Sequence, residues 1–131
     1  MKQSFLFIIF LLSSILVFSQ NFRLQVNYYQ NSCANQREYA NGESRLLWSL
    51  TTTQATLYYG SNNMPIENYK IIESGYDNQN NIYNYSFYDS KRDKYGVIVY
   101  FKERNYLSMQ YVNTKCSLDY VFYWNLNLTK W

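Results

Sequence analysis

Apolar and polar residues alternate with a period of two along much of this chain, and that pattern limits the fold more than any other feature. Phe22, Leu24 and Val26 are separated by Arg23, Gln25 and Asn27, as in a strand with one buried face. Further segments rich in β-branched and aromatic residues lie at 45–50, 55–59, 69–73, 82–88, 95–102, 106–112 and 118–124. Their spacing predicts a mainly β fold, a small antiparallel sandwich or barrel-like sheet of about eight strands.

Two short segments with turn-forming residues predict β-hairpins. Asn41-Gly42 suits a two-residue type I′ turn and would join a strand at 36–40 to the one at 45–50. Glu103-Arg104-Asn105 predicts a tight reversal between 95–102 and 106–112. No segment predicts a long amphipathic helix, although 32–48 has room for one, which would make the fold α+β.

The segment 95–102 also carries a prediction about the core. Val97, Val99 and Phe101 share one face, while Ile98, Tyr100 and Lys102 share the other. The first face is the more uniformly apolar. We therefore expect Val97, Val99 and Phe101 to be buried.

The N-terminus resembles a secretory signal. Lys2 precedes an apolar run from Phe5 to Phe18, which is shorter than the about 20 residues that cross a bilayer and fits the about 7–15 of a signal core. Cleavage after Ser19 would leave one β-rich domain, 20–131, in a secreted, periplasmic or cell-surface location. If the helix is retained, the chain would instead be a structural accessory subunit anchored in a membrane or surface assembly.

The chain has two cysteines, Cys33 and Cys116. In an oxidising compartment they predict one disulfide, and the alternative is a pair of free buried thiols. With no histidine and no third cysteine, zinc would lack its usual ligands.

No motif for catalysis or cofactor binding is present. The absence of histidine removes the commonest general base and the Ser-His and Cys-His systems. The polar run 77–81 departs from a calcium loop at Gln79 and Ile82 and has Tyr88 in place of the bidentate glutamate. We therefore expect a protein that is not an enzyme and has no catalytic, cofactor-binding or metal-binding residues.

The aromatic content is unusual, with 16 tyrosines, 8 phenylalanines and 3 tryptophans. Tyrosine suits half-buried strands, which explains much of it. Exposed rings would alternatively form a stacking platform for sugars or another ligand with an apolar face. The net charge of +3 is too small to favour nucleic acid or an anionic membrane. We therefore expect no nucleic-acid partner, and a membrane partner only if the N-terminal helix is retained.

One local concentration of positive charge consists of Lys91, Arg92, Lys94, Lys102 and Arg104. As a basic patch it would bind an anionic polymer or lipid headgroups; alternatively, these cations protect a hairpin edge from aggregation. Asn84 and Asn127 begin the triplets Asn84-Tyr85-Ser86 and Asn127-Leu128-Thr129, which are possible glycosylation sites.

A Cys pair that brackets Ser74-Gly75, Tyr83 and Phe87, behind a signal, resembles the periplasmic C-type lysozyme inhibitors. The resemblance implies inhibition of a lysozyme. The sequence departs from that family in the longer spacing between Ser74-Gly75 and Tyr83, in a further strand after Cys116 and in its basic charge. The main prediction is an exported, non-catalytic binding or accessory module whose partner is another extracytoplasmic protein or a glycan.

Overall fold

The computed structural model describes residues 21–122, which form one antiparallel sheet of nine strands with almost no helix. The strands are β1 (Phe22–Asn31), β2 (Glu38–Tyr39), β3 (Leu46–Leu50), β4 (Gln54–Tyr59), β5 (Met64–Asp77), β6 (Ile82–Asp89), β7 (Lys94–Phe101), β8 (Tyr106–Tyr111) and β9 (Leu118–Phe122). Two single-turn 3-10 helices, η1 (Gly42–Ser44) and η2 (Lys102–Arg104), interrupt them. The predicted signal lies outside the described residues.

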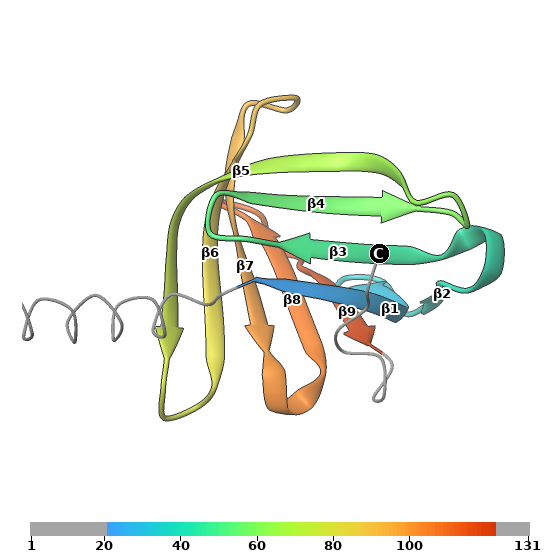
Figure 1. The fold of residues 1–131 in the computed structure, drawn as a ribbon, viewed down its shortest axis with the longest axis horizontal. Coiled ribbons are helices and arrows are strands. Elements are labelled where there is room, and N and C mark those ends of the chain that lie inside the picture. Colours follow the sequence, from blue (N-terminus) through green and yellow to red (C-terminus); the bar gives the residue numbers. More distant parts are fainter. Residues whose placement is uncertain (1–20, 123–131) are drawn as a thin grey trace, which may run out of the picture.

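Eight of the strands close into a barrel (Figure 1). From β3 to β9 each strand pairs with its neighbours in the chain, and β1 closes the ring because it pairs with both β3 and β9. Phe22–Gln25 pair with β3, whereas Val26–Asn31 pair with β9 after a bulge. The extra strand β2 adds to the end of β1. The mainly β prediction is confirmed, and closure makes the sheet a barrel.

Aromatic rings fill the barrel at the end where β1 begins. The Phe22 ring lies 4.7 Å from Tyr83 and 5.0 Å from Tyr100, and Tyr100 lies 5.8 Å from Phe122, all between ring centroids. These side chains come from β1, β6, β7 and β9, and all are buried. This end of the barrel is therefore closed by side-chain packing.

The predicted buried face of β7 is wrong. Ile98 and Tyr100 point into the barrel and are 0% and 1% exposed, while Val97, Val99 and Phe101 are only half-buried. A Cβ added at Gly96, on the inner face, would collide with the Phe87 ring. A narrow barrel needs small residues opposite large ones, and the inner face of β7 therefore combines a glycine with large side chains. The more uniformly apolar face of β7 points outward.

The hairpin predicted at Asn41-Gly42 is also absent. β2 and β3 both pair with β1 and not with each other. Gly42 does take a positive φ of 57°, but it begins η1, whose turn is closed by Arg45 N–H donating to the Gly42 carbonyl. Within 32–48 this one turn is the only helix. The reversal at 103–105 is confirmed, with Asn105 left-handed between β7 and β8.

The strand predicted at 69–73 is much longer in the structure. β5 runs through Pro65 and Gly75 and bends strongly as it passes from one end of the barrel to the other (Figure 1). Register shifts opposite Leu57/Tyr58 and at Ile71/Glu73 mark the irregular points. Pro65 is tolerated because it lies near the start of the strand beside the first shift.

None of the helices among residues 21–122 is long and apolar enough to span a membrane.

Candidate ligand-binding site

The opposite end of the barrel, where β1, β4, β6 and β8 end, is hollow. It holds a cavity of about 640 Å³ lined by residues of β1 to β5, β8, β9, η1 and the β6–β7 loop. The lining is largely aromatic, with the six tyrosines Tyr29, Tyr39, Tyr59, Tyr69, Tyr111 and Tyr120. We refer to this opening as the barrel mouth.

The floor of the cavity is apolar and buried. Leu57 and Met109 line it and are almost inaccessible to solvent. Beneath them the fully buried Trp48 ring lies 5.5 Å from Tyr120 and 6.3 Å from Tyr69, both lining residues. Large rings therefore fill the middle of the barrel beneath the cavity.

One wall of the mouth carries a network of charged and hydroxyl side chains. The Arg92 guanidinium donates to both carboxylate oxygens of Glu67, at 2.7 and 2.8 Å, and to Asp89 Oδ2 at 2.8 Å. The Tyr111 hydroxyl donates to the same Asp89 oxygen at 2.7 Å. Asp89 also accepts the backbone N–H groups of Lys91 and Arg92 at 3.1 and 3.3 Å, so its buried carboxylate is fully bonded and holds the β6–β7 loop.

The network keeps both acids ionised. The pKa of Glu67 lies below its ordinary value because Arg92 donates hydrogen bonds to its carboxylate. Burial acts to raise the pKa of Asp89, but hydrogen bonds from Arg92 and Tyr111 outweigh it and leave that pKa lowered. Burial raises the pKa of the Tyr69, Tyr111 and Tyr120 hydroxyls. The mouth thus presents neutral phenols beside charged carboxylates.

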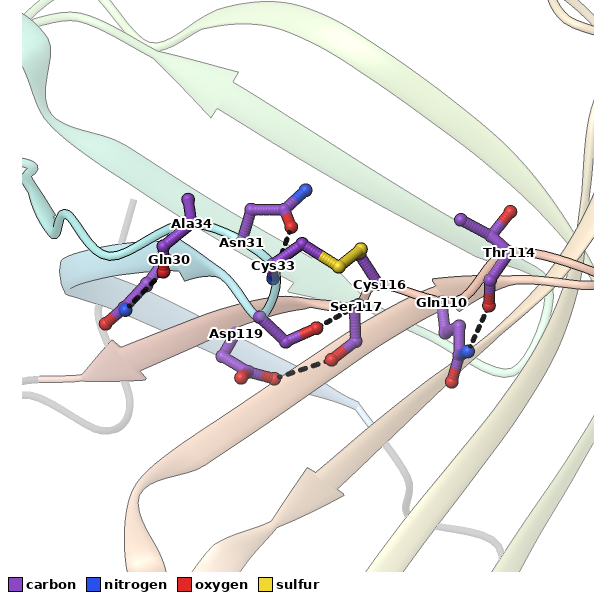
Figure 2. The surroundings of a disulfide bond; sticks show 10 residues. Gln30, Asn31, Cys33, Ala34, Gln110, Thr114, Cys116, Ser117 and Asp119 are labelled. Carbon is purple, nitrogen blue, oxygen red and sulfur yellow. Dashed lines mark hydrogen bonds between the residues drawn. A yellow bond between two sulfur atoms is a disulfide. The ribbon is translucent and has the colours of Figure 1, made fainter.

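The predicted disulfide is confirmed and lies at the same end of the barrel (Figure 2). Cys33 follows β1 and Cys116 lies in the β8–β9 loop, with 5.4 Å between their Cα atoms. Next to it, Ser32 N–H donates to the Ser117 carbonyl at 2.7 Å and Ser117 N–H to Ser32 Oγ at 2.8 Å. These bonds extend the seam between the first and last barrel strands beyond the sheet itself.

The five cations of the predicted basic patch do not come together. Lys91, Arg92 and Lys94 lie at the mouth, whereas Lys102 and Arg104 lie at the closed end, because strand β7 separates the two groups. They protect no free edge either, since β7 is paired with β6 and β8 along its length. Arg92 is engaged by two carboxylates.

Of the two predicted glycosylation sites, Asn84 is exposed on β6, and Asn127 lies outside the described residues. Among residues 21–122, no group of three or more His, Cys, Asp or Glu side chains is arranged to hold a metal ion.

Apart from Arg92, a member of the predicted basic patch, the mouth residues were not found from the sequence. Glu67 and Arg92 are 25 residues apart, and Tyr111 lies 22 residues from Asp89. No motif connects such positions, and only the high tyrosine content pointed to an aromatic surface.

These features define a small closed barrel with a ligand-sized opening at one end. In this class, eight strands leave room either for side chains or for one small ligand. The chain matches no known family model, and searches of curated proteins and of solved structures also find no match.

Proposed function

We propose that this protein is a non-catalytic binding module that takes a small ligand with an apolar face into the barrel mouth. The observation that carries the proposal is the cavity of about 640 Å³ at the mouth, opposite the end of the barrel that aromatic rings fill. Small-molecule sites have volumes of about 300–1,000 Å³, mostly apolar linings and a few placed polar groups. The mouth has all three properties.

The lining favours a ring or chain over a protein surface. Six tyrosines offer flat apolar faces with hydroxyls at their edges, which suits ligands with one apolar and one polar side. Of the two partners suggested by the sequence, a glycan end is small enough to enter, whereas a protein would insert at most a side chain. The exported location is part of the proposal, and the Cys33–Cys116 disulfide is consistent with an oxidising compartment.

The absence of catalysis is likewise proposed, from the state of the two acids that Arg92 binds at the mouth. Arg92 binds both Glu67 and Asp89 with charge-assisted hydrogen bonds, which hold these carboxylates ionised and occupied. A general base needs a pKa near the working pH and free access to substrate. Neither acid meets those conditions, so we assign the network to shaping the wall.

The proposal is tested by titration with N-phenyl-1-naphthylamine, a neutral apolar dye whose fluorescence rises in a dry site. We expect saturable binding at one site. Leu118→Trp should abolish it because Leu118 lines the mouth and is only half-buried, so that a larger ring fills the cavity. Ile72→Trp adds the same ring at an exposed β5 position outside the cavity and should leave binding unchanged. Absence of saturable binding, or equal binding by both variants, would contradict the proposal.

A further inference from the structure

The charges at the mouth allow the ligand class to be narrowed. Three charged side chains line the cavity: Glu38, Glu67 and Arg92. Arg92 is within 2.8 Å of both Glu67 and the buried Asp89, so one positive charge faces two negative ones. Glu38 adds a further carboxylate, which leaves these four side chains with more negative than positive charge. Lys91, in the same loop as Arg92, and Lys94, the first residue of β7, are exposed and are not among the lining residues, although Lys94 Nζ lies 5.7 Å from the centroid of the lining Tyr111 ring.

We propose that the ligand is an organic cation, an amine or quaternary ammonium group on an apolar body, held by the tyrosine rings and the excess carboxylate charge of the mouth. This inference rests on the proposed function, because it names the chemistry of the ligand that the same cavity takes.

The tyrosines supply the first part of the argument. Ring faces of tyrosine attract ammonium groups, and cages of several aromatic rings are the usual receptors for methylated amines. One lining ring already shows this preference, since Lys94 Nζ lies 5.7 Å from the centroid of Tyr111. Among the described residues, no other cation is placed over a lining ring within cation–π distance. Of these rings, Tyr39 and Tyr59 are exposed and Tyr29 is half-buried, so their faces are the ones open to a ligand cation.

The carboxylates supply the second part. Glu67 is only 17% exposed and Asp89 only 1%, so water screens their charges less than it would at the surface. The charge of Glu67 adds to the burial that raises the pKa of Tyr69 and Tyr120, because it opposes a second negative charge beside it. The same field opposes an anionic ligand and favours a cationic one.

The direct test compares ligands of equal shape and different charge on the disulfide-bonded protein. Phenyltrimethylammonium and tert-butylbenzene are isosteric, one cationic and one neutral, and benzenesulfonate is the anionic counterpart. We expect the cation to bind about tenfold more tightly than its neutral isostere, the size that cation–π contacts in a partly dry cage supply. Benzenesulfonate should bind more weakly than either. Isothermal titration calorimetry or amide chemical shifts give the three affinities.

Two variants tie the preference to the named carboxylates. Glu38→Gln removes a charge from the exposed strand β2, and Glu67→Gln removes one from the cavity wall. Each substitution should reduce the preference for the cation severalfold without weakening binding of the neutral isostere. Glu103→Gln removes an exposed carboxylate from η2 at the closed end and serves as the matched control. Because Glu38 is exposed, its variant remains informative even if Glu67→Gln unfolds.

The possible failures are distinguishable. The cation inference is overturned if the neutral isostere binds as tightly as the cation, or if Glu103→Gln lowers the preference as much as Glu38→Gln. In either case, dye binding would still support a ligand site at the mouth. If neither the dye nor any of the three phenyl ligands binds, the proposed function fails as well.

Discussion

At the residue scale, the barrel interior is governed by how rings fit and not by hydropathy alone. Tyr100 has a hydroxyl, yet its ring is enclosed between Phe22 and Phe122. Gly96 on the same face leaves room for Phe87. A face that looks less apolar in sequence is therefore the buried one.

This assignment predicts unequal effects for two neighbouring substitutions. Ile98→Ala should lower the free energy of unfolding by about 2–5 kcal/mol, because it removes a fully buried side chain and leaves a cavity. Val99→Ala should cost less than about 1 kcal/mol, since Val99 is half-buried on the outer face. Urea unfolding of both variants measures the difference. A larger loss for Val99→Ala would reverse the assignment of inside and outside.

The charged residues of the β6–β7 loop also differ from one another. Arg92 binds the buried Asp89, whereas Lys91 is exposed on the same loop. Neighbouring cations thus have separate roles, one structural and one on the surface.

At the element scale, the seam between β1 and β9 is what makes the sheet a barrel. Those strands lie at the two ends of the described chain, so pairing them closes a long loop, and the entropy cost of that closure is large. The disulfide joins residues 83 apart across the same seam.

Removing the disulfide should therefore destabilise the protein more than most surface changes. Cys33→Ser with Cys116→Ser should lower the free energy of unfolding by about 2–5 kcal/mol, as for native disulfides in small domains. Guanidinium unfolding checks the loss. Reductant should bring the wild-type protein to a similar stability and leave the double variant unchanged. Equal stability of the oxidised wild type and the double variant would show that the sheet closes the seam unaided.

At the scale of the whole molecule, the described barrel begins at β1, directly after the predicted signal. Phe22 already packs against Tyr83 in the closed end, so the expected cleavage after Ser19 falls just before the first structural residue. A cut there would leave the barrel intact.

We predict that the protein isolated from its native source begins at Gln20, because an apolar run of this length followed by a small residue is typical of a cleaved signal. Mass spectrometry of the N-terminal peptide checks this. Recovery of Met1 in the membrane fraction would instead indicate an uncleaved anchor and favour the structural-subunit alternative.

The sequence by itself determined the strands, the β7–β8 reversal and the cysteine partners, since alternation, turn residues and an even cysteine count are local or compositional signals. It missed the length of β5 and misplaced the hairpin at Asn41-Gly42, where pairing with β1 overrides a local turn preference. Only the tertiary structure decided which face of β7 is inside and which residues meet at the mouth. Antiparallel pairing of β5 with β6 sets Lys70 opposite Tyr88, and this register brings Glu67 of β5 to Arg92 of the β6–β7 loop across 25 positions of sequence. No local pattern encodes that contact, because it depends on which strands pair and in which register.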